Sequence, residues 1–323
     1  MSDVRFKKEA LTGPHADALD KAFGAKNSFW KFTPGNLLMP SFFEDIAGQI
    51  LDASVREDDV WLISYPRTGS TWTQEMVWLI GNELDFEQAR KTIQQLRAPM
   101  IELSTYFAEY TNFIAGYGNS VEIVENWPTP RFIKTHLPVE FLPTQMHKVK
   151  PKIIYVARHP KDLCVSYYHH CQLMHHMDIG FEEFAELFIN DTVPLGAVFD
   201  HYLGYWAMRD DPNVLFIMYE DLKKDTGAGI RRIAEFMEKS LSDDEVDKLE
   251  DFLSVENMRK NPGCNMAPIL DSLMGENYLE KTGKSFIRKG KVGDWKTHMS
   301  PDLSRRFDEW IRRKTEGTGL SFD

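Results

Sequence analysis

Cysteine is scarce in this sequence of 323 residues, which contains Cys164, Cys171 and Cys264. Such a sparse and odd set is typical of a reducing compartment, so we expect free thiols. Long apolar runs are missing too, because the longest, such as 76–80, fall far short of the roughly 20 residues that a membrane helix needs. The first ten residues include acidic side chains and no apolar block, which argues against a signal peptide and predicts a cytoplasmic protein.

Basic residues are outnumbered, with 38 Lys and Arg against 49 Asp and Glu and a formal net charge of −11. This balance argues against broad binding to nucleic acid or to an anionic membrane, so any anion site must be local. The hydrophobic share of 42% and the charged share of 27% are typical of a globular protein that buries its own core. No repeat or linker divides the chain, so we expect one domain over residues 1–323, with 1–35 as an N-terminal extension.

Short apolar runs bounded by turn residues are typical of buried parallel strands. The four clearest runs span 60–65, 131–136, 152–158 and 213–219. Apolar residues at three- and four-residue spacing predict helices between and after these runs. The predicted helices span 71–81, 161–176, 181–190 and 195–209. Strands that alternate with helices indicate an α/β fold with a central parallel sheet flanked by helices.

Helix-capping residues predict two further helices near the C-terminus. Ser242 and Glu245 form a capping box that opens a helix to about Leu253, and Ser300-Pro301 supplies an N-cap and a first-turn proline. Between these helices, from 261 to 293, the periodicity fails and several prolines and glycines interrupt the chain. A stretch of this length without regular structure is typical of a lid or a binding loop.

The segment from Ser64 to Trp72, with the sequence SYPRTGSTW, follows an expected strand, contains a glycine turn and opens an expected helix. Free backbone N–H groups and the helix dipole favour an anion at such a turn, although a plain strand-to-helix turn has the same pattern. Ser64 and Ser70 replace the first glycine and the lysine of the nucleotide-triphosphate loop, which argues against a kinase or an ATPase. The cation of this turn is Arg67 instead.

A second segment, 130–138 with the sequence PRFIKTHLP, places Lys134 and His136 two residues apart. Side chains at this spacing share one face of a strand, here near its carboxyl end, where open α/β sheets bind ligands. A nearby cation disfavours protonation of an imidazole, so His136 would remain neutral and able to accept a proton. A purely structural histidine is the alternative.

Two further segments carry cations that could bind phosphate. Arg158 ends an expected strand and Ser166 lies about two turns into the next helix, so the two could hold one phosphate; a structural pair of Arg158 with Asp162 is the alternative. Near the C-terminus, the cations from Arg288 to Lys291 form either a local anion clamp or a solvated surface run.

One helix concentrates potential metal ligands. Cys171 and His175 have the i,i+4 spacing of a metal-binding pair, with His169, His170 and His176 nearby. No second ligand pair is evident in the sequence, so we expect no metal site.

Together these four segments resemble the cytosolic sulfotransferase family, and the resemblance extends from about Phe42 to Trp310. The family motifs Y-P-K-S-G-T-T-W, K-T-H-L-P, A-R-x-x-K-D-x-x-x-S-Y and R-K-G are similar to residues 65–72, 134–138, 157–167 and 288–290. The resemblance implies a single α/β domain with a P-loop-like phosphosulfate-binding turn. It also implies transfer of a sulfuryl group from 3′-phosphoadenosine 5′-phosphosulfate to a hydroxyl of a small, largely apolar acceptor such as a phenol, steroid, retinoid or alcohol, without a metal.

The same resemblance implies roles for individual residues. His136 would be the general base, and Lys134 and Arg67 the catalytic cations. The implied donor-binding residues are Arg67, Thr68, Gly69, Ser70, Thr71, Trp72, Arg158, Ser166, Tyr219, Arg288, Lys289 and Gly290. The 3′-phosphate would bind to Arg158, Ser166 and 288–290, and adenine would stack on Trp72. The implied acceptor pocket contains Phe42, Phe43, Tyr106 and Phe107, for which aromatic core is the alternative.

Three segments depart from the family pattern. Arg67 stands where the family usually has lysine, and Val255 stands where its adenine-binding segment has an aromatic residue. The family dimer motif K-x-x-x-T-V-x-x-x-E appears as Lys296 followed by Ser300-Pro301 and Arg305, which argues against a homodimer through this segment. A nucleotide-binding protein that kept the fold and lost efficient turnover is therefore the alternative to an enzyme.

Overall fold

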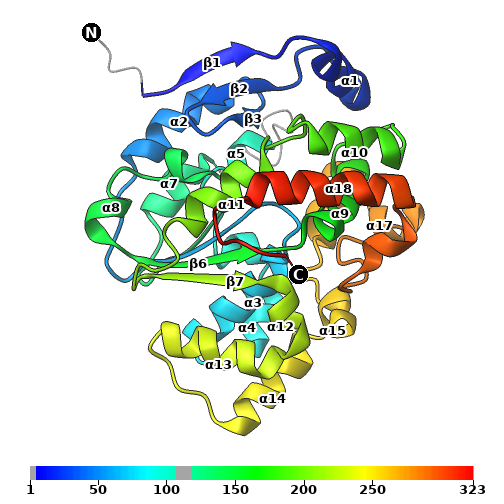
Figure 1. The fold of residues 1–323 in the computed structure, drawn as a ribbon. Helices are drawn as coiled ribbons and strands as arrows, with labels where there is room; N and C mark the ends of the chain where they lie inside the picture. The colour runs from blue at the N-terminus through cyan, green and yellow to red at the C-terminus, as the bar shows by residue number, and fades with distance from the viewer. Residues whose placement is uncertain (1–4, 107–117, 323) are drawn as a thin grey trace.

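A four-stranded parallel sheet with the strand order β5-β4-β6-β7 lies at the centre of the computed structural model (Figure 1). The model describes residues 5–106 and 118–322. The strands are β4 (Val60–Ser64), β5 (Phe132–Thr135), β6 (Lys152–Ala157) and β7 (Val214–Met218). Each strand falls within one of the apolar runs, so the expected central parallel sheet is confirmed.

Helices occupy most of the rest of the described chain. From the N-terminus to β7 they are α1 (Pro14–Phe23), α2 (Phe43–Asp52), α3 (Ser70–Gly81), α4 (Phe86–Lys91), η1 (Gln94–Leu96), α5 (Leu103–Tyr106), α7 (Ser120–Glu125), η2 (Val139–Phe141), α8 (Met146–Val149), α9 (Pro160–Met174), α10 (Phe181–Ile189) and α11 (Val198–Trp206). After β7 they are α12 (Tyr219–Lys224), α13 (Thr226–Phe236), α14 (Asp243–Phe252), α15 (Val255–Lys260), α16 (Ala267–Met274), α17 (Tyr278–Thr282), η3 (Asp294–Thr297) and α18 (Pro301–Thr315).

The helices predicted from periodicity and caps are confirmed, with shifted ends. The largest shifts are at the two ends of α11, which spans Val198–Trp206 where 195–209 was predicted. Its start is delayed because Leu195 and Gly196 have left-handed backbone, with φ of 67° and 76°. The capping box of Ser242 and Glu245 opens α14, and the Ser300 side chain caps α18. No helix in 5–106 or 118–322 is long and apolar enough to cross a membrane.

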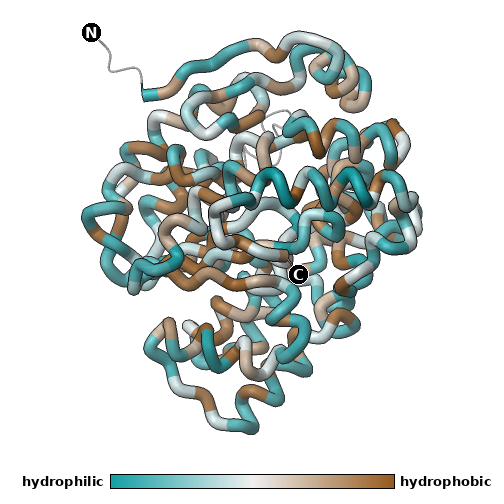
Figure 2. The backbone as a smooth tube through the Cα atoms, viewed as in Figure 1, coloured by the Kyte–Doolittle hydropathy of each residue, from teal (hydrophilic) through white to brown (hydrophobic). Residues whose placement is uncertain are grey.

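The two faces of the sheet are covered by different helices. Along β4, Trp61 and Ile63 pack into one core cluster that includes side chains of α9, α11 and α18. Leu62 packs into a second cluster with side chains of α3, α13 and α14. Figure 2 shows hydrophobic colour along much of the sheet strands and hydrophilic colour on the outer helix α18. This alternation explains why the strands are continuous apolar runs, since both faces are buried.

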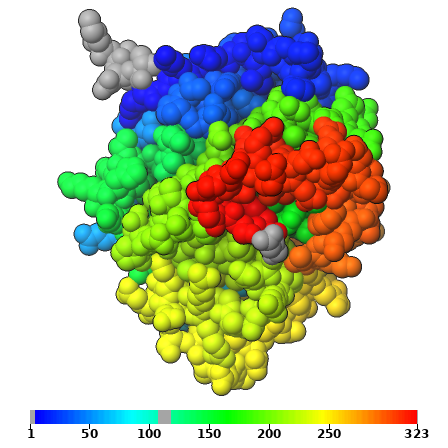
Figure 3. Space-filling model, viewed as in Figure 1, coloured from blue at the N-terminus to red at the C-terminus, as the bar shows by residue number. Residues whose placement is uncertain are grey.

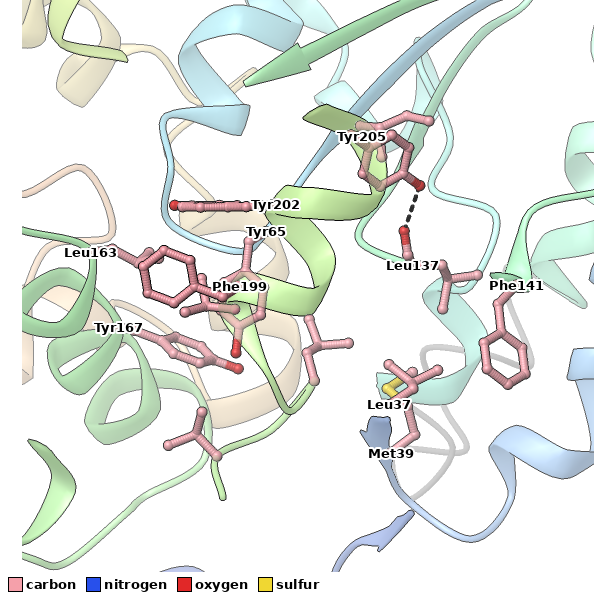
Figure 4. Close-up of a cluster of buried hydrophobic side chains, with 14 of the residues drawn as sticks. Leu37, Met39, Tyr65, Leu137, Phe141, Leu163, Tyr167, Phe199, Tyr202 and Tyr205 are labelled. Carbon is pink, nitrogen blue, oxygen red and sulfur yellow. Dashed lines mark hydrogen bonds between the residues drawn. The ribbon is translucent and has the colours of Figure 1, made fainter. Parts of the chain in front are cut away.

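Several buried tyrosines and phenylalanines belong to the core cluster on the α11 side of the sheet, part of which is shown in Figure 4. The hydroxyl of Tyr205 donates to the carbonyl of Leu137, and the hydroxyls of Tyr65 and Tyr167 donate to the carbonyl of Pro194. These bonds fix the chain just after β4 and β5, which is the edge of the sheet where the site lies.

The N-terminal part of the chain forms a small antiparallel sheet of β1 (Lys7–Ala10), β2 (Trp30–Thr33) and β3 (Leu37–Met39). It lies at the top of the molecule in Figures 1 and 3, beside α1 and α2. None of these elements was predicted from periodicity. The buried side chains of Phe32, Leu37 and Met39 join the main core cluster, so this sheet is packed onto the domain.

The segment from 261 to 293 was expected to lack regular structure, and this expectation is wrong in part because α16 and α17 lie within it. Both helices are too short to give a clear periodic signal. Pro268 occupies the first turn of α16, a position where proline is compatible with a helix.

Candidate active site

The turn between β4 and α3 has the geometry of an anion-binding loop. The Thr68 hydroxyl donates to the Tyr65 carbonyl over 2.9 Å and closes the turn. Arg67 and Gly69 have left-handed backbone, with φ of 71° and 103°. A Cβ at position 69 would lie 2.6 Å from the ring of Tyr219, so only glycine fits there. The N-terminus of α3 therefore presents its first N–H groups and its positive dipole end beside this turn.

A pocket of about 100 Å³ lies beside this turn, and we call it the donor pocket. Its lining includes every expected donor-binding residue except Thr68, whose side chain is buried and faces Tyr65. Thr68 can therefore contribute only its backbone N–H group. The lining also includes Val255, one of the departures from the family pattern, and five residues to which the sequence analysis gave no role: Lys223, Leu253, Met258, Phe286 and Ile287. Trp72 is fixed by a 3.0 Å hydrogen bond from its Nε1 to the carbonyl of Leu253.

Arg158 reaches the donor pocket from the end of β6. Its guanidinium stacks 4.6 Å from the ring centre of Tyr219 and donates to the carbonyls of Arg67 and Lys291. Within the described chain, its buried Nε has no hydrogen-bonding partner. Asp162 accepts hydrogen bonds from the backbone of Gly293 and Trp295, so the alternative pairing of Arg158 with Asp162 is wrong.

Arg288 and Lys289 form a second cationic wall of the donor pocket. Both pair with Asp294, at 2.6 and 2.8 Å. The Arg288 side chain is only 21% exposed, so it is no solvated surface cation. Gly290 has a φ of 58°, and a Cβ there would lie 2.5 Å from Val255. Residues 288–290 therefore pack closely against Val255, for which the family resemblance implies a position beside adenine.

Arg67 lies between the two sides of the site. Its Nε donates to Ser166 Oγ over 3.3 Å, and one terminal nitrogen donates to the Phe286 carbonyl over 2.9 Å. Its guanidinium also stacks over the Phe286 ring at 4.7 Å. Burial, followed by repulsion from Arg158 and Arg288, lowers the pKa of Arg67 to about 10, so the side chain keeps its charge at neutral pH.

His136 follows β5 and is 8% exposed. Its Nδ1 lies 2.6 Å from the carbonyl oxygen of Ser64, which can only accept a hydrogen bond. Nδ1 therefore carries the proton of the neutral ring, and Nε2 carries the free lone pair. Burial, and then the charge of Lys134, hold the pKa of His136 well below its usual value. The same factor, burial, lowers the pKa of Lys134 to about 8.

Glu102 is a buried carboxylate next to these residues that the sequence analysis did not identify. It accepts hydrogen bonds from the backbone N–H of His136 at 2.7 Å and from Thr135 Oγ1 at 2.8 Å. Its neighbour Ile101 donates to the Lys134 carbonyl, so segment 99–102 lies along β5. Burial raises the pKa of Glu102 to about 7. The sequence signal that could have identified Glu102 is its position between the apolar residues Ile101 and Leu103.

A cavity of about 470 Å³, which we call the acceptor cavity, opens beside Lys134 and His136. Phe42 and Tyr106 line it, as expected. Phe43 does not, because its side chain is fully buried in the core and packs edge-on against Phe32 and Phe141; the expectation for Phe43 is wrong. Adjacent helical residues point about 100° apart, which separates Phe42 from Phe43. Phe107 lies outside the described residues.

Segments far apart in the sequence line the acceptor cavity. The sequence analysis did not assign to it the following lining residues: 23, 25–29 and 39–41 from the N-terminal part, Pro66, Gln95, Met100 and Leu103, Tyr167, His170, Met174 and His175 from α9 and its end, Pro194 and Leu195, Met266, Leu273 and Met274 around α16, and Phe286. Arg67, Ser70, Thr71 and Phe286 line both the acceptor cavity and the donor pocket. The two spaces therefore meet at the phosphate-binding turn.

The remaining motifs have simple surroundings. Cys171, like the other two cysteines, is a buried free thiol. In the parts of the chain that the structure describes, no group of three or more His, Cys, Asp or Glu could hold a metal ion. Ser300 caps α18, and Arg305 pairs with Asp302 and Glu309 of the same helix. The expectation that the degraded motif disfavours a homodimer through this segment stays a prediction.

Comparison with known proteins agrees with this geometry. A sulfotransferase domain model matches residues 57–319. Luciferin sulfotransferase of Photinus pyralis is 39% identical over 281 residues, which cover 84% of this chain and 75% of that protein. Sulfotransferase 1C2 of Homo sapiens is 39% identical over 295 residues, which cover 90% and 94%. Retinol dehydratase, solved with retinol and PAP and with androsterone and PAP, has a TM-score of 0.89 at 29% identity and covers 98% of this chain. The chain therefore belongs to the sulfotransferase family and is a sulfotransferase that depends on 3′-phosphoadenosine 5′-phosphosulfate.

Proposed function

We propose that this enzyme transfers the sulfuryl group to the hydroxyl of a small, largely apolar molecule, with His136 as the general base. The observation that carries the proposal is the junction of the donor pocket with the acceptor cavity at Arg67, Ser70 and Thr71. A sulfuryl group bound at the turn is adjacent to an acceptor in the cavity, and proximity of this kind supplies much of the rate of a group transfer.

The negative charges of the donor match the cationic side chains of the donor pocket and the anion-binding turn between β4 and α3. Its phosphosulfate would bind at the N-terminus of α3, and its 3′-phosphate would bind to Arg158, Ser166, Arg288, Lys289 and Gly290. The buried, unpaired Nε atoms of Arg158 and Arg288 support this assignment, since each is a free donor for an anion within the described residues. Trp72, which is held at the pocket wall, would stack on adenine beside Tyr219.

The transfer can proceed with the chain's own groups. The acceptor oxygen forms its bond to sulfur as the bond between sulfur and the 5′-phosphate oxygen breaks, and the hydroxyl proton passes to Nε2 of His136. Lys134 and the N–H groups at the start of α3 would stabilise the sulfuryl oxygens, and Arg67 would stabilise the leaving phosphate. The products are the sulfate ester and adenosine 3′,5′-bisphosphate. Arg67 and Lys134 supply the positive charge, so the proposal includes no metal.

The cavity lining supports an apolar acceptor. Most of its side chains are aromatic or aliphatic, and a volume of about 470 Å³ suits a molecule of drug-like size. Retinol and androsterone, the ligands of the structural relative, are both apolar alcohols. Residues 266 to 290 contribute to both the cavity and the donor pocket, which supports a role of 261–293 as a lid.

The experiment is a screen of phenols, steroids, retinoids and aliphatic alcohols with donor labelled in its sulfuryl group. We expect transfer to apolar acceptors and a loss of about 10²- to 10⁴-fold in turnover for His136→Ala, with bisphosphate binding retained. His147→Ala, at an exposed histidine on α8, is the matched control. Binding of the bisphosphate without turnover on any acceptor would favour the binding-protein alternative, and ATP-dependent transfer would favour a kinase.

A further inference from the structure

Two polar atoms on residues that line the acceptor cavity are buried without a hydrogen-bonding partner in the described part of the chain. They are Nδ1 of His170 and the hydroxyl oxygen of Tyr106. The neighbouring hydroxyl of Tyr167, by contrast, donates to the carbonyl of Pro194 over 2.9 Å. Native proteins pair nearly all of their buried polar groups, so an unpaired atom on a residue that lines a ligand cavity is a candidate partner for a polar group of the ligand.

The surroundings of His170 are aromatic and keep its ring uncharged. The ring stacks on Tyr167 at 5.9 Å and lies edge-on to Phe286 and His175 at 6.0 and 5.9 Å. Burial, followed by the charges of Arg67 and His175, holds the pKa of His170 well below its usual value; His136 and Lys134 act in the same direction. A neutral imidazole offers one N–H donor and one nitrogen acceptor.

The imidazole can change the direction of Nδ1 without breaking a hydrogen bond of this atom to the described part of the chain. A half turn about the Cβ–Cγ bond exchanges Nδ1 with a ring carbon, and such a flip leaves the shape of the side chain nearly unchanged. Since Nδ1 has no partner among the described residues, the flip breaks no hydrogen bond of this atom. His170 is therefore free to offer a donor or an acceptor to the cavity that it lines.

We propose that His170 is a specificity-determining residue that hydrogen-bonds a second, uncharged oxygen of the acceptor, either a hydroxyl or a carbonyl group. This inference rests on the proposed function of the cavity. A cationic group is disfavoured, because Arg67 and Lys134 line the same cavity. The ring of Phe286, which also lines the cavity, contacts both His170 and Arg67, at 6.0 and 4.7 Å from its centre. The second oxygen would therefore bind at the wall of the cavity that His170 and Phe286 form.

The test compares acceptors that differ by one oxygen on the same skeleton. The probes are naphthol against the isomeric dihydroxynaphthalenes, and androsterone against the matching steroid alcohol without its ketone. For at least one pair we expect the wild-type enzyme to prefer the acceptor with two oxygens by about 10-fold in kcat/KM, the value of one neutral hydrogen bond. His170→Phe should reduce this preference to about two-fold or less, the statistical advantage of a diol.

Matched variants separate hydrogen bonding from packing. His170→Gln keeps a donor and an acceptor and should retain part of the preference. His169→Phe, on the same helix, is the control, because His169 packs against Tyr168 and His298 and should leave the preference unchanged. Melting temperature and bisphosphate affinity verify folding, and His170→Leu replaces the phenylalanine variant if that one is unfolded.

The outcomes are distinct. Equal kcat/KM for every acceptor pair in the wild type, or an unchanged preference in His170→Phe, would overturn the role of His170 while leaving sulfuryl transfer intact. A loss of preference in His170→Phe with retention in His169→Phe and His170→Gln would support it. Failure to sulfate any acceptor would instead contradict the proposed function.

Discussion

Replacement of Glu102 by glutamine should change how the stability of the protein depends on pH. The carboxylate is 0% exposed and receives hydrogen bonds from Thr135 and His136. Glutamine has the same shape and keeps one acceptor oxygen, but it cannot ionise. The substitution therefore removes a buried charge next to Lys134 and leaves the packing nearly unchanged.

The size of the effect follows from the shifted pKa of Glu102. Burial raises this pKa from 4.5 to about 7, so the folded state favours the protonated acid. Ionisation then opposes folding as the pH rises from the unfolded value through the folded one. A shift of this size corresponds to roughly 3 kcal/mol, lost between about pH 4 and pH 8. Below the unfolded pKa the acid is protonated in both states and this contribution vanishes.

Urea unfolding of wild type and Glu102→Gln across this pH range is the assay. We expect the free energy of unfolding of the wild type to fall relative to the variant by roughly 3 kcal/mol as pH rises. Glu122→Gln, at an exposed position of α7, keeps Glu102 and is the control; its free energy of unfolding should depend on pH as that of wild type does. Curves for wild type and Glu102→Gln that stay parallel at every pH would refute the argument.

The same variant has a kinetic consequence at Lys134. The negative charge of Glu102 raises the pKa of Lys134 against the larger lowering by burial, which leaves it at about 8. Without that charge, Lys134 should lose its proton at lower pH. The alkaline loss of kcat should then begin at lower pH in Glu102→Gln than in wild type, and an unmoved alkaline limb would show that Lys134 does not titrate during turnover.

The remaining predictions concern the donor pocket and the base. Arg158→Ala should weaken binding of adenosine 3′,5′-bisphosphate by about 1.5–3 kcal/mol but scarcely affect adenosine 5′-phosphate, which lacks the 3′ group; calorimetry with both nucleotides checks this. Arg67→Ala should cost about 2–4 kcal/mol of transition-state stabilisation at saturating donor, whereas Arg67→Lys should hold or raise turnover; abolished activity in Arg67→Lys would mean that the turn depends on the guanidinium. Burial and the charge of Lys134 keep the pKa of His136 well below the usual value of histidine, so kcat should not fall through protonation of His136 as the pH decreases to that usual value. A fall of kcat near neutral pH that disappears in His136→Ala would contradict the assignment of a neutral base.

The central sheet could be predicted because its strands are buried on both faces. Continuous apolar runs such as Val60–Ser64 and Lys152–Ala157 leave little ambiguity when helical periodicity separates them. The helix caps at Ser242 and Ser300 could also be predicted from the sequence, since their hydrogen bonds are local. The start of α11 was misplaced because the left-handed backbone at Leu195 depends on a hydrogen bond from its N–H to Leu38, far away in the sequence.

Most residues that line the donor pocket could also be predicted from the sequence, because each of the four motifs is continuous in sequence. The structure brings them together as expected, apart from the side chain of Thr68. What the motifs could not give is the pairing within the site. Arg67 contacts Ser166 and Phe286, which lie far from it along the chain. Asp294 pairs with Arg288 and Lys289 within one segment, but the sequence motif does not show which acidic side chain these cations contact.

The wall of the acceptor cavity could be predicted only in part from the sequence. This wall combines side chains from the N-terminal segment, α9 and α16, none of which forms a motif by itself. Phe42 and Phe43 have the same chemistry and adjacent positions, yet one lines the cavity and the other is core, because the helix that begins at Phe43 turns them to different sides. His170 gave the same ambiguity: in the sequence it was one of several histidines on a helix, and only its unpaired nitrogen beside the cavity sets it apart from His169. Acceptor choice is thus determined by tertiary placement, and the His170 series tests that placement directly.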